Sequence, residues 1–160
     1  MLVETEAEFF YAGDNSIAFN STHAIAVWSV GTGGGGRIDY ATYHDGSWSS
    51  PEVAGGGEAG PLMHPQITFD ENGLLIMTYW NATHFPSIWP EYAIYDGTWS
   101  GFENLTEPNP TGMPLILENQ YGSIMIVTAN VGLLMGEEPL YSESLFWDGA
   151  AWSEPVEVLT

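Results

Sequence analysis

The residues best suited to bind a ligand carry aromatic rings beside carboxylates and lie in segments that differ between the repeated parts of the chain. They are His64, His84, Phe85, Trp89, Glu91, Glu137 and Glu138, with the apolar run Leu133–Met135 next to the last two. An aromatic ring can stack on a sugar face while carboxylates accept hydrogen bonds from its hydroxyl groups. These residues are therefore candidates for a sugar site. The sequence favours the alternative, in which Phe85 and Trp89 fold over their own loop and 133–135 are buried at a contact between units or with a partner.

No spacing typical of a metal or phosphate site is present. The four histidines are His23, His44, His64 and His84, and none has the His-x-x-x-His pattern of shared metal ligation. Asp70-Glu71-Asn72-Gly73 lacks the remaining carboxylates of a calcium loop and predicts a turn. Gly33–Gly36 lacks the lysine of a phosphate loop and predicts a hairpin tip. We therefore expect no metal and no cofactor.

Charge and composition exclude several classes of partner and catalyst. The 160 residues include 21 Asp and Glu, whereas Arg37 is the only Lys or Arg, which gives a net charge of −20. Such a chain cannot neutralise several phosphates, so we expect no binding to nucleic acid or to an anionic membrane. Cysteine is absent, which removes thiol catalysis and disulfides. No apolar run is long enough to span a membrane, and the acidic first ten residues do not resemble a signal peptide.

These candidate residues are placed by a repeat of about 52 residues. Asp-Gly pairs occur at Asp45-Gly46, Asp96-Gly97 and Asp148-Gly149, at spacings of 51 and 52 residues, and each is followed by a tryptophan. The tryptophans are Trp48, Trp99 and Trp152. Asp-Gly is a strong hairpin signal because glycine accepts the positive φ of a tight turn. We expect each tryptophan to begin an outermost strand and to anchor one unit to the next.

Hydrophobic patterning predicts four strands in each unit and no helix. The predicted strands are Ile17–Phe19, Ala24–Val30, Ile38–Tyr43 and Trp48–Ala54; then Gln66–Asp70, Leu74–Trp80, Glu91–Tyr95 and Thr98–Leu105; then Leu115–Leu117, Ser123–Ala129, Ser142–Trp147 and Trp152–Leu159. Four antiparallel strands at a period near 50 are typical of a β-propeller blade. The fold class is therefore all-β, with three four-stranded antiparallel blades at about 13–54, 64–106 and 113–160. A β-sandwich of about a dozen short strands is the alternative. It would not explain why the same turn occurs three times at a regular spacing.

The Tyr/Trp-Asp-Gly-(Ser/Thr)-Trp-Ser-x-Pro-Glu signature resembles the repeats of sialidase-like, Asp-box-type propellers, although Asp and Gly are adjacent here. The six-bladed fucose-binding lectins also look similar. The resemblance implies an arginine-lined sugar site in both families and a Tyr-Glu nucleophile pair in sialidases. Because Arg37 is the only arginine, these site residues cannot be carried over, and we expect no catalysis within this chain.

Three functions are consistent with this sequence. The first is a non-catalytic segment that mediates binding or self-assembly. The second is a carbohydrate-binding lectin, and the third is part of a larger sialidase-like, glycan-processing enzyme whose catalytic residues lie elsewhere.

Three blades leave two apolar faces uncovered, since closed propellers have four to eight blades. Residues 1–5 resemble the last strand of a preceding unit, because the segment Leu2-Val3-Glu4 begins 13 residues before Asn15, just as Glu52 lies 13 residues before Pro65. We expect either a homo-oligomer, in which two chains close a six-bladed ring, or a segment of a longer array.

Three Asn-x-Ser/Thr sequons point to an exported protein at the cell surface or outside the cell. Their acceptor residues are Asn20, Asn81 and Asn104.

Overall fold

The computed structural model describes residues 12–32, 35–57, 62–84, 87–105, 112–118, 124–130 and 142–158. These residues form β-strands and turns, which confirms the prediction of an all-β fold. Because none of them is helical, this part of the chain contains no helix that could cross a membrane.

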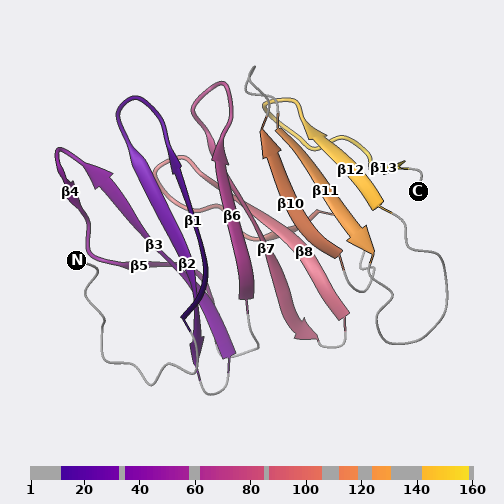
Figure 1. Ribbon diagram of the computed structural model, residues 1–160, viewed down its shortest axis with the longest axis horizontal. Helices are drawn as coiled ribbons and strands as arrows, with labels where there is room; N and C mark the ends of the chain where they lie inside the picture. The colour runs from indigo at the N-terminus through magenta and orange to yellow at the C-terminus, as the bar shows by residue number, and fades with distance from the viewer. Residues whose placement is uncertain are drawn as a thin grey trace.

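The strands form three antiparallel sheets in chain order, with sheet 2 between sheets 1 and 3 (Figure 1). Sheet 1 contains β1 (Ala12–Phe19), β2 (Ala24–Thr32), β3 (Gly35–His44), β4 (Ser47–Trp48) and β5 (Glu52–Gly57). Sheet 2 contains β6 (Leu62–Phe69), β7 (Leu75–His84), β8 (Ser87–Tyr95) and β9 (Glu103–Asn104). Sheet 3 contains β10 (Gly112–Glu118), β11 (Ile124–Asn130), β12 (Ser142–Trp147) and β13 (Val156–Val158).

The tight turns form where the Asp-Gly pairs predict them. Gly46, Gly97 and Gly149 have φ values of 84°, 114° and 98°, which glycine adopts without a steric penalty. Asp45 also has a positive φ, 50°, as a type I′ turn requires. The Asp-Gly pairs therefore act as the turn residues of each sheet.

The outermost strand of each sheet is shorter or more broken than the sequence predicts. In sheet 1 the predicted strand is divided into β4 and β5, which both pair with β3, so this sheet has five strands. The serine after each tryptophan explains the break. The Ser100 hydroxyl accepts a hydrogen bond from the Ile94 backbone N–H at 2.9 Å and donates to the Gly101 carbonyl at 2.8 Å. A side chain thus replaces the ladder partner at this point, and Ser49 and Ser153 do the same.

Sheet 2 contributes to two hydrophobic cores. On one face, Met77 and Tyr79 pack with Val27 and Ile38 of sheet 1. On the other face, Ile76 packs with Ile124 and Trp147 of sheet 3, and the Trp147 indole N–H donates to the buried Asp70 carboxylate at 3.2 Å. Alternate residues of β7 therefore face opposite neighbours, which explains why its sequence is a nearly continuous apolar run.

The first strands of the three sheets are joined by one repeated hydrogen bond. The Ser16 hydroxyl of β1 accepts from the Ile67 backbone N–H of β6 at 3.2 Å. The Gln66 amide oxygen of β6 accepts from the Ile116 N–H of β10 at 2.8 Å. Figure 1 accordingly shows β6 between β1 and β10. The three first strands therefore lie next to one another.

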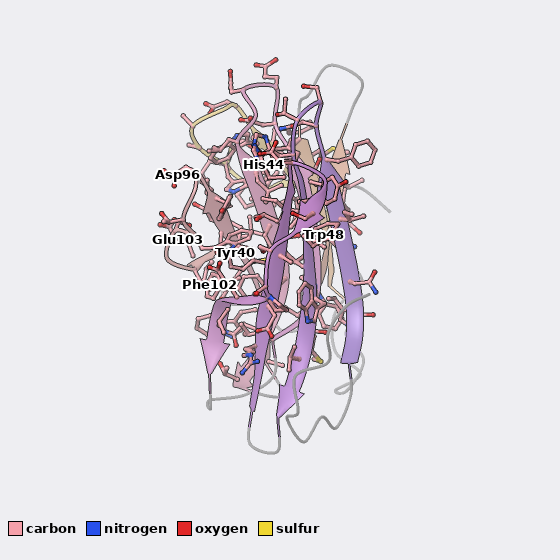
Figure 2. All side chains as sticks on the ribbon, turned by 90° about the vertical axis from the view of Figure 1, so that its left-hand side faces the viewer. Tyr40, His44, Trp48, Asp96, Phe102 and Glu103 are labelled. Atoms are coloured by element: carbon pink, nitrogen blue, oxygen red, sulfur yellow. The ribbon has the colours of Figure 1, made fainter. Side chains whose placement is uncertain are left out.

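A second repeated contact joins the outer parts of the sheets. Tyr40 of sheet 1 packs edge-on against Trp99 of sheet 2, with ring centroids 5.7 Å apart, and Tyr92 of sheet 2 packs likewise against Trp152 of sheet 3 at 5.9 Å. Two of the three repeat tryptophans therefore anchor one sheet to the preceding one, as predicted. Trp48, the third, remains 42% exposed on the outer face of sheet 1, which Figure 2 views directly.

Candidate functional site

An acid and a histidine meet where the first strands of sheets 1 and 2 begin. The Nδ1 atom of His64, in β6, lies 2.5 Å from the Asp14 Oδ2 atom, in β1. Their side chains are 37% and 50% exposed, so both can contact solvent or a ligand. We refer to the end of the sheets that carries this pair as the Asp14 end.

The backbone at both residues departs from regular strand geometry. The β1–β2 register shifts between Gly13 and Asn15, and the β6–β7 register shifts between Met63 and Gln66. His64 has a φ of 53°, in the left-handed region that non-glycine residues rarely adopt. Bulges and such outliers redirect side chains and are common next to binding and active sites. Two neighbouring strands therefore bulge at the residues whose side chains meet.

Trp80 completes the cluster from the second strand of sheet 2. Its ring packs edge-on against His64, with centroids 4.6 Å apart. The buried Trp80 indole nitrogen has no hydrogen-bond partner among the described residues. The indole nitrogens of Trp99 and Trp152, which pack between sheets, are buried without a partner in the same way, so this feature does not by itself mark a ligand site. The Asp14–His64–Trp80 cluster thus offers a carboxylate, an imidazole and an aromatic ring.

Glu91, which the sequence predicts as a ligand-binding residue, is buried between two sheets instead. Its carboxylate accepts hydrogen bonds from the Tyr79 hydroxyl and, at 2.8 Å, from the Asn81 amide. Burial, and then the bond to Glu91, raise the pKa of Tyr79 far above its usual range. Because Glu91 pairs with Tyr79 in the ladder and points toward sheet 1, it is part of the junction between two sheets.

Arg37 is already engaged by a carboxylate. Its Nε and Nη2 atoms donate to the two oxygens of Asp39 at 2.7 and 3.1 Å. The hydrogen bond to Asp39 raises the pKa of this guanidinium. Because Arg37 is the only Lys or Arg in the sequence, binding a ligand carboxylate there would require breaking this bidentate pair.

The other predicted ligand-binding residues are only partly placed. The half-buried Trp89 pairs with Asn81 in the β7–β8 ladder, and His84 pairs with Ser87. Phe85, Glu137, Glu138 and residues 133–135 lie outside the described residues. Asp14 was missed by sequence reasoning, although the repeat that matches Asn15 with Pro65 also matches Asp14 with His64.

The sequons differ in their surroundings. Asn20 is exposed, and its Oδ1 atom accepts from the Thr22 and His23 backbone N–H groups. Asn104 is exposed in β9. Asn81 instead donates to Glu91 and accepts from the Thr83 N–H at 3.0 Å. A glycan on the Asn81 nitrogen would therefore disrupt a bond in the junction between two sheets.

Among the described residues, no group of three or more His, Asp or Glu side chains is arranged to hold a metal ion.

Searches with the sequence find neither a matching protein-family model nor a curated protein that matches significantly. Solved structures do share the fold. The catalytic domain of a GH62 α-L-arabinofuranosidase from Coprinopsis cinerea has a TM-score of 0.63 at 13% identity, over 97% of this chain and 54% of its own. A Hadza microbial sialidase has a TM-score of 0.63 at 15% identity, over 88% of this chain and 37% of its own. A thermostable family-43 glycoside hydrolase has a TM-score of 0.57 at 13% identity, over 92% of this chain and 53% of its own.

These matches show a propeller-like fold of the kind found in glycoside hydrolases. The chain spans about half the length of the arabinofuranosidase domain and the family-43 enzyme. The prediction that the chain is not an enzyme is contradicted, because solved structures that share its fold include glycoside hydrolases. That prediction rested on the missing arginine cluster, which excludes one kind of sugar site but not glycoside hydrolysis in general. The expected sialidase-like repeats gain partial support from the sialidase match, which concerns the fold alone.

Proposed function

We propose that this chain is part of a glycoside hydrolase with a propeller fold, and that its glycan site lies at the Asp14 end. The observation that carries this proposal is the Asp14–His64 pair, formed at two bulges on neighbouring first strands. The glycoside hydrolases whose structures share the fold support this proposal. The three sheets would be three blades, joined by the repeated hydrogen bonds and ring contacts described above.

Asp14 is suited to acid–base chemistry or to binding sugar hydroxyl groups. Its half-exposed carboxylate is held in place by His64, and the ring of Trp80 packs on His64 beside it. Most glycoside hydrolases use a second carboxyl group on the other side of the scissile bond. Glu137 and Glu138 are our candidates for this second group. They belong to the connection between β11 and β12. This connection starts and ends near the Asp14 end, where Ala129 pairs with Ser142.

Neutral glycans are the proposed substrate class. The net charge of −20 repels anionic sugars, and the only guanidinium is already paired with Asp39. A sialic acid carboxylate would find no free Lys or Arg. Neutral pentose or hexose units can be bound by carboxylates that accept hydrogen bonds from their hydroxyl groups and by an aromatic ring that packs on the sugar. The Asp14 end provides both kinds of group.

The test is a hydrolysis assay with aryl α-L-arabinofuranoside, β-D-xyloside, β-D-mannoside and sialoside, together with calorimetric titration of the parent sugars. We expect turnover of at least one neutral glycoside and loss of about 10²–10⁴-fold in Asp14→Asn. Asp96→Asn, an exposed acid in an Asp-Gly turn, is the matched control and should change the rate less than twofold.

Several outcomes would contradict the proposal. An unchanged rate in Asp14→Asn would place the site elsewhere. Turnover of the sialoside alone would contradict the substrate class. Sugar binding without turnover would favour the carbohydrate-binding alternative.

We also propose that further blades cover the two outer faces, from a second copy or from a longer array. Ile17 and Phe19, 56% and 77% exposed, are equivalent in the repeat to Ile67 and Phe69, which pack on the core between sheets 1 and 2. On sheet 3, Phe146, Val156 and Val158 are similarly exposed. Light scattering of the chain tests self-assembly, and a stable monomer would contradict a homo-oligomer.

A further inference from the structure

Two histidine rings stack at the end of sheet 1 opposite to the Asp14 end. His23 follows the β1–β2 turn, and His44 is the last residue of β3 (labelled in Figure 2). Their ring centroids lie 4.9 Å apart, with 29° between the ring planes. The register explains the meeting, because Ala24 pairs with Tyr43 and the next residue outward on each strand is a histidine. Residues 21 positions apart in the sequence are thus brought into contact.

A hydroxyl group holds the ring of His23 at its Nδ1 atom. The Asn20 Oδ1 atom accepts from the backbone N–H groups of Thr22 and His23, at 3.0 and 2.9 Å, which identifies it as the amide oxygen. The Thr22 hydroxyl lies 3.2 Å from this oxygen and 2.7 Å from His23 Nδ1. Because a hydroxyl group can donate or accept, this contact fits either neutral tautomer of His23. In the tautomer with the proton on Nδ1, Nε2 has a free lone pair.

His44 is held with its proton on Nδ1 by a carboxylate. Its Nδ1 atom lies 2.9 Å from Asp45 Oδ2, and a carboxylate accepts the Nδ1 proton. Its side chain is 58% exposed, so the ring has room to turn toward solvent. Histidines that bind metals usually donate their second ring N–H to an oxygen atom in this way, which orients the ring and raises its basicity.

The pair belongs to sheet 1 alone. The residues outward of the equivalent ladder positions are Leu74 and Asp96 in sheet 2, where Leu75 pairs with Tyr95. In sheet 3 they are Ser123 and Asp148, next to the pair Ile124–Trp147. The repeated scaffold therefore does not require histidine at these two positions.

Two imidazole nitrogens suit a borderline divalent cation. Zinc–nitrogen bonds of about 2.0–2.1 Å place two tetrahedral ligand atoms about 3.3 Å apart. In the stacked arrangement, with 29° between the ring planes, the two Nε2 lone pairs do not converge, so a shared ion requires at least one ring to turn out of the stack. The large negative charge of the chain favours cation binding. No third His, Asp or Glu among the described residues joins the pair in a metal-holding group, which leaves the other metal positions to water.

We propose that His23 and His44 form a bidentate binding site for a borderline divalent cation such as Zn²⁺, Ni²⁺ or Cu²⁺, with Thr22 and Asp45 orienting the two rings. The site is independent of the proposed glycan site, because the Asp14 end lies at the other end of the sheets.

The test is calorimetric titration of the full chain with ZnCl₂ and NiCl₂ at pH 7.5, in buffer containing 5 mM MgCl₂ to occupy nonspecific acidic sites. We expect one metal ion per chain and at least a tenfold loss of affinity in both His23→Ala and His44→Ala. His64→Ala is the matched control, because it removes a single histidine that also pairs with a carboxylate, and its affinity should stay within twofold of wild type. Asp45→Asn keeps both rings and should weaken binding less than either histidine variant.

Thermal unfolding guards against misfolded variants. Metal that binds the native state should raise the unfolding midpoint of the wild-type chain, but not that of His44→Ala, whose metal-free midpoint should match wild type within a few degrees. The proposal is overturned if the wild-type chain takes up no Zn²⁺ or Ni²⁺ at millimolar concentration. It is equally overturned if both single variants bind as the wild-type chain does.

Discussion

Gly55 gives a sharp test of how sheets 1 and 2 are packed. A Cβ atom built on Gly55 in β5 would lie 1.8 Å from both Cε2 and Cζ of Phe102. Phe102 follows the Asp-Gly turn of sheet 2, packs on the core shared by the two sheets, and lies edge-on to Tyr79 at 4.8 Å. Since carbon atoms in contact are about 3.5–4.0 Å apart, the ring must move. We expect Gly55→Ala to lower the free energy of unfolding by about 1–3 kcal/mol, as overpacked cores do.

A second background determines whether the Phe102 ring is the cause. Phe102→Leu removes Cε2 and Cζ, the two atoms that would clash. The φ of Gly55 is outside the left-handed region, so alanine fits its backbone. In the Phe102→Leu background, Gly55→Ala should therefore be neutral or should raise the free energy of unfolding by about 0.4–1 kcal/mol, because alanine restricts the unfolded chain.

Urea unfolding followed by tryptophan fluorescence measures all four members of this cycle. The two positions should be coupled by at least about 1 kcal/mol, which is typical of residues in direct contact. In a thermal scan, each kcal/mol should shift the midpoint by about 2–4 °C. An equal destabilisation by Gly55→Ala in both backgrounds would refute the packing inferred here.

Three further predictions concern other contacts between strands and sheets. Ser100→Ala removes the acceptor of the Ile94 N–H at 2.9 Å, so it should cost about 1 kcal/mol and speed amide exchange at Ile94. Burial, and then a hydrogen bond to the Glu103 carboxylate in β9, raise the pKa of Tyr92 to about 12. Its stabilising contribution is therefore complete below about pH 10 and lost as the pH rises toward 12, so equilibrium unfolding from pH 7 to 12 should show a smaller alkaline loss in Tyr92→Phe. Trp147→Phe removes the indole donor to buried Asp70 and should cost about 1–3 kcal/mol in urea unfolding, whereas an unchanged stability would contradict a role in joining sheets 2 and 3.

Local turn chemistry made the architecture predictable from sequence. Gly46 and its two equivalents have a positive φ, which a two-residue turn requires. Because this requirement is local, the Asp-Gly pairs show it directly in the sequence. The outermost strands were less predictable, because the hydroxyl of Ser100 competes with the ladder for a backbone N–H. A serine beside a tryptophan gives no sequence signal that distinguishes this role from ordinary exposure.

The candidate site was only half visible. His64 was identified as a candidate, but its partner Asp14 lies 50 residues earlier on another strand, and only the packing of β1 against β6 joins them. Glu91 was a ligand-binding candidate because it follows a segment that differs between the repeats and lies close to aromatic residues. Its pairing with the hydroxyl of Tyr79 and the amide of Asn81 depends on the face that β7 turns toward sheet 1. Burial and partners of this kind are properties of the packed sheets, which a single sequence does not specify.

The repeated ring contact makes the proposed homo-oligomer testable in one substitution. Trp99 and Trp152 each pack on a tyrosine of the preceding sheet, but Ser144 occupies the equivalent position on sheet 3. A second copy placing its Trp48 against sheet 3 would therefore meet a serine and lose a contact worth about 0.5–1.5 kcal/mol. Ser144→Tyr should tighten self-association about 2- to 12-fold in sedimentation equilibrium.

Trp48→Ala should abolish this gain, because the added tyrosine would then have no ring to contact. An association constant that is unchanged by Ser144→Tyr would refute head-to-tail stacking of two copies. In that case a further sheet of a longer array would supply the tyrosine that packs on Trp48. The face of sheet 1 around Trp48 is exposed, whereas the equivalent face of sheet 2 is buried against sheet 1.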